Sequence, residues 1–306
     1  MAESLTEIGG SRSATLRSAV KAALLIGICV RFGPSLLSLI SMPSSEFQVV
    51  ATAGGLSRIP EAVTTAKEEY RRVKAEREAF EAFTAGVQEL DTVEDLQSDA
   101  SDMGGIVFHG STATTEPTTD SIQDLYRETF MSVDHYDEEY NEPLRTNASA
   151  ELGLDLEAVL ATNSRLTPPL KRELIRASRT AARDRKRFQT LVKSELNSLT
   201  DARTQVQSAA ETATRIHDED LVGHSIAELE AQTQRLQTIE RECKSLVEDR
   251  QAEYVSGPEG DGIHFKEYLY DQHEWTHPVV CDALDVIRSL REAKHRVEST
   301  LIEQLK

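Results

Sequence analysis

The sequence predicts an all-α fold: an elongated helical bundle that contains a long antiparallel coiled-coil hairpin. Three observations support this fold class. Aromatic residues make up only 5% of the chain, apolar residues recur at three- and four-residue spacing over long stretches, and stretches rich in Gly, Pro, Ser and Thr separate these repeats. Apolar residues at this spacing lie along one face of a helix, and a repeat held over several heptads is typical of coiled coils.

The first long helix is expected over residues 59–90. Pro60 lies in its first turn, where the missing N–H is least costly. Its apolar repeat consists of Ile59, Val63, Ala66, Tyr70, Val73, Phe80 and Val87. Residues 91–119 hold Gly, Ser, Thr and Asp with little periodicity, so we expect a flexible insert there.

Two short helices are expected next, over residues 120–133 and 152–162, with an acidic turn at residues 134–143 between them. Five acids and His135 lie within residues 134–142. Carboxylates at this density can hold a hard divalent cation, but the regular ligand alternation and the Gly of an EF-hand loop are missing. A solvated turn that pairs with arginines is therefore the better interpretation.

The strongest apolar repeat follows Pro168 and Pro169, with Thr167 as the expected N-cap. Its members are Leu170, Leu174, Ala177, Ala181, Phe188, Val192, Leu199, Ala202, Val206, Ala209, Ala213 and Ile216. A turn at residues 217–223 leads into a second helix over residues 225–254, with the repeat Ile226, Leu229, Leu236, Cys243 and Val247. Two long helices joined by a short turn pack antiparallel, which gives the predicted hairpin.

The last part of the chain is expected to hold a Gly/Pro loop at residues 255–262 and a short aromatic element at residues 265–270. A final helix is expected over residues 278–305. Its inward side chains are expected to be Cys281, Leu284, Ile287, Leu290, Val297 and Leu301. We therefore expect one helical coiled-coil domain over residues 59–306.

The N-terminal extension, residues 1–58, differs from this domain. Residues 22–40 form an apolar stretch that Arg31, Gly33 and Pro34 interrupt. Its apolar side chains favour insertion into a membrane, whereas a central Arg disfavours it by about 2.5 to 3.5 kcal/mol, so the sum is near zero. We expect an ordered or peripheral helix, or a start codon placed too early; a membrane anchor is the alternative.

The charge balance is strongly acidic, with 34 basic against 52 acidic residues and a net charge of −18. Carboxylates keep their hydration in concentrated salt, so this balance predicts a salt-adapted, haloarchaeal-type cytoplasm. Cys29, Cys243 and Cys281 lie far apart without a C-x-x-C pair, which excludes a disulfide framework and a four-Cys zinc site. We expect a cytoplasmic protein, with membrane anchoring through residues 22–40 as the alternative.

Residues 273–277 read H-E-W-T-H, which matches the H-E-x-x-H signature of zinc proteases. In those enzymes two histidines one helical turn apart bind zinc, and the Glu acts as general base on the metal-bound water. Pro278 argues against this, because proline disfavours helical geometry at His277 and its ring would clash with the carbonyl of Glu274. We expect Pro278 to begin the last helix. A zinc-dependent hydrolase using His273, His277 and Glu274 is the alternative.

Two further patterns have weaker functional interpretations. Residues 105–112 resemble a phosphate loop but have Ser111 where a Lys must reach the phosphates. Residues 171–187 hold eight basic and two acidic residues, and four arginines share one helix face: Arg172, Arg176, Arg179 and Arg183. A nucleic-acid interface is disfavoured there, because no aromatic residues interleave for base stacking and molar salt shortens the Debye length to about 3 Å. We expect this stretch to pair with acidic segments such as residues 134–142.

Three stretches carry a resemblance to a known family. Residues 75–83 read AEREAFEAF, residues 126–144 contain YRETFMSV, HYDEEY and EPL, and residues 268–278 contain YLY, WT and P. They resemble an uncharacterised family of haloarchaeal helical proteins known only as a domain of unknown function, over residues 59–306. The resemblance implies a helical fold and a high-salt habitat, and it implies no activity.

These observations together predict a non-enzymatic protein that acts through a protein partner or through self-association. The basis is a long apolar repeat without a constellation of catalytic groups. No cofactor, metal or nucleic-acid partner is expected. Besides the zinc-dependent hydrolase, a membrane-tethered helical scaffold is an alternative function.

Overall fold

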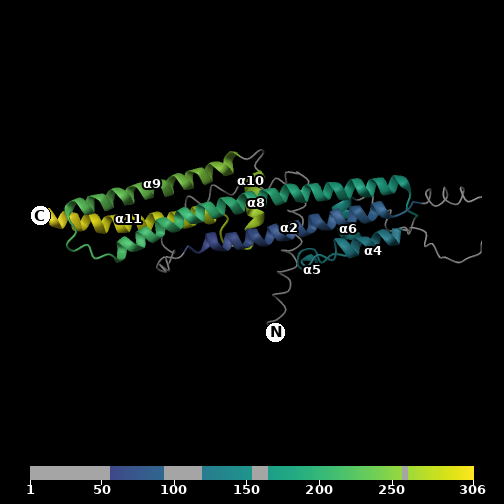
Figure 1. The fold of residues 1–306 in the computed structure, drawn as a ribbon, viewed down its shortest axis with the longest axis horizontal. Coiled ribbons are helices and arrows are strands. Elements are labelled where there is room, and N and C mark those ends of the chain that lie inside the picture. Colours follow the sequence, from purple (N-terminus) through teal and green to yellow (C-terminus); the bar gives the residue numbers. More distant parts are fainter. Residues whose placement is uncertain (1–55, 93–118, 154–164, 257–260) are drawn as a thin grey trace, which may run out of the picture. The chain divides into compact units, whose positions relative to one another are not determined.

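The computed structural model describes residues 56–92, 119–153, 165–256 and 261–306 (Figure 1). Its helices are α2 (Arg58–Glu89), α4 (Thr119–Thr129), α5 (Tyr136–Glu139), α6 (Leu144–Leu152), α8 (Pro168–Asp218), α9 (Ile226–Ser256), α10 (Asp261–Leu269) and α11 (Pro278–Gln304). The predicted all-α class is confirmed. Among the described helices, none combines the length and the apolar character that crossing a membrane requires.

Several sequence predictions fall outside the described residues. They are the apolar stretch at residues 22–40, the phosphate-loop-like residues 105–112, Cys29, and most of the helix expected over residues 152–162. The flexible insert expected at residues 91–119 also lies almost wholly outside them.

The chain divides into two compact units. Of the described residues, unit 1 holds Glu69–Val192, and unit 2 holds residues 56–68 together with Lys193–Lys306. The long helices α2 and α8 each contribute one part to unit 1 and another to unit 2.

Unit 1 has an aromatic core built from α2, α4 and the segment through α5. Its rings are Phe80, Phe83, Tyr126, Phe130, Tyr136 and Tyr140. The Phe80 and Phe130 centroids lie 4.3 Å apart, and Phe83 meets Tyr126 edge to face at 5.4 Å. Such pairs contribute about 0.5 to 1.5 kcal/mol each beyond the burial of area. The cluster therefore ties α4 and α5 to one face of α2.

One polar contact and one glycine complete the packing of α2 in unit 1. The Lys171 ammonium donates to the carbonyl oxygen of Leu90 at 2.6 Å, which satisfies a carbonyl just past the end of α2. Gly86 allows α4 to approach closely, since a Cβ added there would lie 2.6 Å from Leu125 Cδ1.

Unit 2 contains α9 and α11, which pack side by side (Figure 1). It also contains a long-range helix cap. The Asp282 carboxylate of α11 accepts a hydrogen bond from the backbone N–H of Ile59 at 2.9 Å. It also forms an ion pair with Arg58 Nη1 at 3.1 Å. The first N–H groups of a helix have no partner within the helix, so Asp282 supplies one for α2.

Three sequence-based boundaries were wrong. The helix expected to reach residue 133 ends at Thr129, because the N–H groups of Phe130 and Met131 both bond to the Tyr126 carbonyl and the chain turns into the aromatic core. Helix α5 lies inside the stretch expected to be a turn. Helix α10 begins within the expected loop at residues 255–262.

Helix α6 occupies residues for which no helix was expected, apart from its last residue, Leu152. Pro143 precedes it in an extended conformation, and Gly153 follows it with a φ of 110°. Proline at the start of a helix and glycine just past its end are ordinary helix boundaries, so the sequence did contain this signal.

Most members of the apolar repeats are buried, but two were wrongly placed inward. Leu284 is 49% exposed and Ile226 is 39% exposed. On α11 the buried face runs through Val279, Ala283, Val286 and Leu290 instead, which leaves Leu284 on the outer side of the helix.

Candidate functional site

Unit 1 encloses a group of charged side chains, which we call the polar cluster: Glu76, His135, Glu139, Glu151 and Arg185. Four of them are almost completely buried, with exposed fractions of 0% for Glu76, 4% for Arg185, 6% for Glu139 and 7% for His135. Burying a charge is unfavourable unless it is paired, so the partners within this cluster decide its chemistry.

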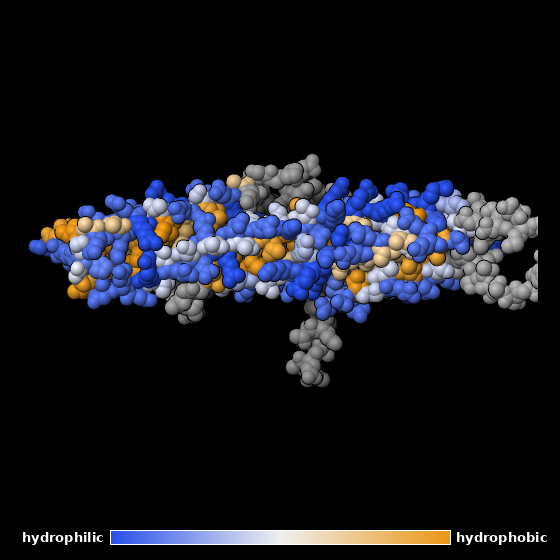
Figure 2. Space-filling model, viewed as in Figure 1, coloured by the Kyte–Doolittle hydropathy of each residue, from blue (hydrophilic) through white to orange (hydrophobic). Residues whose placement is uncertain are grey.

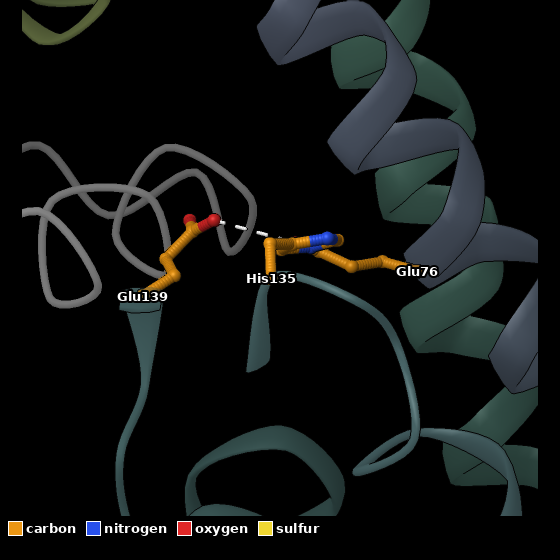
Figure 3. Close-up of side chains that lie close together, drawn as sticks. All are labelled: Glu76, His135 and Glu139. Carbon is orange, nitrogen blue, oxygen red and sulfur yellow. Dashed lines mark hydrogen bonds and ion pairs between the residues drawn. The ribbon is translucent and has the colours of Figure 1, made fainter. Parts of the chain in front are cut away.

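His135 lies between two carboxylates that come from different elements (Figure 3). Its Nε2 is 3.1 Å from Glu76 Oε1 of α2 and 4.0 Å from Glu139 Oε2 of α5. His135 and Glu139 are held on one helical turn, since the N–H of Glu139 donates to the carbonyl of His135 at 3.0 Å. One potential ligand atom from each of these three side chains lies within 4.8 Å of the other two. Within the described residues, this is the group of His, Cys, Asp or Glu side chains that could hold a metal ion.

Arg185 donates hydrogen bonds to two carboxylates of the cluster. Its Nε donates to Glu76 Oε2 at 3.0 Å and its Nη2 to Glu151 Oε1 at 2.6 Å, and its guanidinium carbon lies 5.2 Å from the Phe80 ring centroid. Burial alone would lower the pKa of Arg185, but the carboxylates of Glu151 and Glu76 and the Tyr140 hydroxyl outweigh it and raise that pKa well above its ordinary value. Arg185 is therefore a permanent buried cation.

Gaps in two apolar repeats of the sequence mark the positions of Glu76 and Arg185. The apolar repeat of the first helix skips from Val73 to Phe80, and Glu76 occupies the gap. The repeat of the long helix skips from Ala181 to Phe188, and Arg185 occupies that gap. A charged residue at an inward position of a helical repeat requires a buried partner, so two such gaps with opposite charges predict an ion pair.

A second buried polar group lies in unit 2 and follows the same rule. Glu195, in a gap of the α8 repeat, accepts a hydrogen bond from the Tyr270 hydroxyl at 2.9 Å and pairs with Arg250 at 3.3 Å and with Lys266 at 3.6 Å. His277 lies beside this group, and burial followed by the charge of Lys266 lowers the pKa of His277 below its ordinary value of 6.5.

The H-E-x-x-H residues do not lie on a helix. His277 is the N-cap of α11, with φ of −126° and ψ of 67°, and Pro278 is the first residue of that helix, as the sequence predicts. His273 instead stacks on Trp275 with ring centroids 4.1 Å apart, and its Nε2 lies 2.9 Å from Thr65 Oγ1. Glu274 is exposed. The geometry does not bring His273, Glu274 and His277 together as a group of ligands.

The basic stretch at residues 171–187 has two kinds of arginine. Arg172, Arg176, Arg179 and Arg183 are exposed, as their shared helix face predicts. Arg176 pairs with Glu173, and Arg183 bonds to Thr180, both on the same helix. Glu138 belongs to the acidic segment that was expected to pair with this stretch, and it pairs with Arg72 of α2 at 3.2 Å. The buried ion pairs of the stretch are those of Arg185.

The two cysteines among the described residues are poorly suited to nucleophilic chemistry. Burial raises the pKa of the Cys243 thiol to about 11 and raises that of Cys281 as well. Because the thiolate is the nucleophile, both side chains stay in their unreactive thiol form near neutral pH.

Residues 57–294 match the model of a protein family described as a domain of unknown function (DUF7260). The resemblance to a family known only in this way is thus confirmed, while a haloarchaeal origin stays a prediction. No curated protein and no solved structure matches the chain.

Proposed function

The chain belongs to the DUF7260 family of domains of unknown function, and we propose that it acts without catalysis, through contact between protein surfaces, with a second copy of itself as the partner. We also propose that the antiparallel coiled-coil hairpin forms the body of the contacting unit. Three pairings within unit 2 support the hairpin: Glu195 with Arg250, Gln205 with the Glu242 carbonyl, and Glu219 with Gln232. Rising residue numbers on α8 meet falling numbers on α9, as antiparallel helices require.

One observation carries the proposed contact. Four apolar side chains near the turn between α8 and α9 and the end of α11 are exposed; we call them the turn-end surface. They are Val222 at 86%, Leu305 at 65%, Ile302 at 54% and Ile226 at 39%. The Gln304 side chain donates to the His224 carbonyl at 3.0 Å, which places the end of α11 beside this turn. Hydrophobic side chains gather near the C-terminus in Figure 2. Exposed apolar patches are typical of interaction sites.

The charges around this surface favour a second copy in concentrated salt. Asp218, Glu219 and Asp220 lie at the same turn, so two copies repel one another at low ionic strength. Molar salt shortens the Debye length to about 3 Å and screens this repulsion, while apolar contact persists. A salt-rich cytoplasm, which the net charge of −18 supports, is the environment that we propose.

The geometry of the H-E-x-x-H residues supports the non-enzymatic half of the proposal. A zinc protease needs both histidines on one helical face and the Glu directed at the metal-bound water. Here His277 precedes a helix that begins at Pro278, and the His273 ring stacks on Trp275 and contacts Thr65. His273 therefore has a packing role, and His277 occupies the N-cap position of α11 without a side-chain cap hydrogen bond.

Light scattering of matched variants in molar KCl tests the proposal. Val222→Ser removes the most exposed apolar side chain of the turn-end surface, and Leu284→Ser is the control, because Leu284 is 49% exposed on α11 but is not part of that surface. We expect the wild type and Leu284→Ser to have the mass of two chains and Val222→Ser to shift toward one. Equal masses for the two variants would overturn the assignment of the surface, and a wild type with the mass of one chain would overturn self-association.

A further inference from the structure

We propose that Glu76, His135 and Glu139 bind a divalent first-row transition-metal ion, with Zn²⁺ as the expected occupant. This inference goes beyond the proposed self-association and does not depend on it. It rests on four features of the polar cluster: the type of the ligand atoms, their spacing, the way that the protein holds them, and the balance of buried charge.

The ligand types are one imidazole nitrogen and two carboxylate oxygens. Zn²⁺ accepts both, whereas Mg²⁺ and Ca²⁺ prefer oxygen ligands alone. Among first-row ions, affinity for a mixed nitrogen and oxygen site rises toward copper and zinc. Three protein ligands leave one position of a tetrahedral zinc for water.

The spacing of the ligand atoms fits a common ion. Ligands about 2.0 to 2.2 Å from a tetrahedral zinc lie roughly 3.4 Å from one another. His135 Nε2 and Glu76 Oε1 are 3.1 Å apart, and His135 Nε2 and Glu139 Oε2 are 4.0 Å apart. A small rotation of the Glu139 side chain closes the second distance, because both residues already lie on one hydrogen-bonded turn.

The surroundings hold the ligands in place. His135 and Glu139 are four residues apart on that turn, so they form a chelating pair without a change in the backbone. Glu76 Oε2 accepts a hydrogen bond from Arg185 at 3.0 Å, which leaves Oε1 turned toward His135. A hydrogen bond to the second oxygen of a ligating carboxylate is the usual support in protein metal sites.

The charge balance of the cluster favours a cation. Glu76, Glu139 and Glu151 are three nearly buried carboxylates, and the buried guanidinium of Arg185 pairs with Glu76 and with Glu151. Arg72, at 31% exposed, reaches Glu139 Oε2 at 4.0 Å from the rim. A divalent ion bound among these three carboxylates would compensate their charge, as buried charges require.

Titration of the chain with Zn²⁺ tests this site. Because the ligands are buried, the protein is first unfolded in urea with a chelator, refolded without metal, and then titrated by calorimetry. We expect one Zn²⁺ per wild-type chain. In His135→Asn and in Glu139→Gln the loss of affinity should exceed the roughly 10- to 100-fold that is typical when only the partners around the ligands are changed. The controls are His295→Asn, at an exposed position, and His273→Asn, in the H-E-x-x-H stretch. Both controls should bind as the wild type does.

Three outcomes would overturn the proposal. A wild-type chain that binds no Zn²⁺ would leave His135 as a buried hydrogen-bond partner of Glu76 only. Loss of binding in His273→Asn with retention in His135→Asn would move the metal to the H-E-x-x-H residues. Equal affinity in all variants would identify adventitious surface binding. Far-UV circular dichroism of each variant separates loss of ligand from loss of fold, and Glu139→Gln keeps the size of the side chain.

Discussion

Replacing Arg185 by Met should destabilise unit 1 strongly. Met retains much of the apolar volume of the Arg side chain but removes its two charge-assisted hydrogen bonds, to Glu76 at 3.0 Å and to Glu151 at 2.6 Å. Both carboxylates then stay in the interior without their cation. Breaking a buried ion pair by removing one partner is unfavourable by about 3 to 5 kcal/mol.

The contact of Arg185 with the Phe80 ring at 5.2 Å adds to this loss. A cation over an aromatic face contributes about 0.5 to 2 kcal/mol, and the Met side chain recovers part of it by packing. We therefore expect the free energy of unfolding to fall by about 4 kcal/mol, which is a large fraction of the roughly 5 to 15 kcal/mol that stabilises a typical domain.

Urea unfolding followed by circular dichroism, in molar KCl with a chelator present, measures this change. Arg183→Met is the matched control, because Arg183 lies two residues earlier on the same helix and is exposed. The control should change the free energy of unfolding by no more than about 0.5 kcal/mol. The double variant Arg185→Met/Glu76→Leu should recover about half of the loss, since it removes one of the two stranded carboxylates. An Arg185→Met variant as stable as Arg183→Met would refute the reasoning.

Two further predictions concern a buried hydrogen bond and a pH dependence. Tyr126→Phe removes the hydrogen bond from the Tyr126 hydroxyl to Asn147 Oδ1 at 2.7 Å and leaves a buried acceptor without it. The free energy of unfolding, measured in urea, should therefore fall by about 1 to 3 kcal/mol. A change within experimental error would contradict this expectation. The pKa of His277 is lowered in the folded chain, so its contribution to stability is present above the ordinary pKa of 6.5 and is lost as the pH falls through the folded pKa. The wild type should therefore lose stability relative to His277→Asn as the pH falls below 6.5, and parallel stability curves for the two proteins would contradict this sign.

The long helices could be predicted from the sequence because each one carries its own apolar repeat. Helix α2 was expected to begin at Ile59 and begins at Arg58, and α11 begins at Pro278 as expected. The short segments were harder, because tertiary packing decides them. The expected helix over residues 120–133 ends early where Phe130 turns into the aromatic core, which no local pattern reveals.

The polar cluster was only partly accessible from the sequence. The density of acids around His135 was visible, but its partner Glu76 lies 59 residues earlier and belongs to another helix. The cap that Asp282 supplies to Ile59 spans 223 residues and has no local signature. Gaps in the apolar repeats at Glu76, Arg185 and Glu195 were visible, and they indicate where long-range ion pairs form without naming the partner.

The H-E-x-x-H letters show the reverse case, in which a local pattern names a chemistry that the backbone does not support. A single residue, Pro278, was enough to predict that His277 precedes a helix, because the physical effect of proline is local. The positions of His273 against Trp275 and Thr65 required the structure, since Thr65 comes from a distant helix.

Self-association is the central claim, and the salt dependence of the light-scattering mass of the wild-type chain tests it most directly. The apolar turn-end surface with acidic residues at the same turn predicts a mass near one chain at about 0.1 M KCl, where the acidic charges still repel across a Debye length of about 10 Å. In molar KCl we expect a mass of two chains at the same protein concentration. A mass of one chain at both salt concentrations would contradict it.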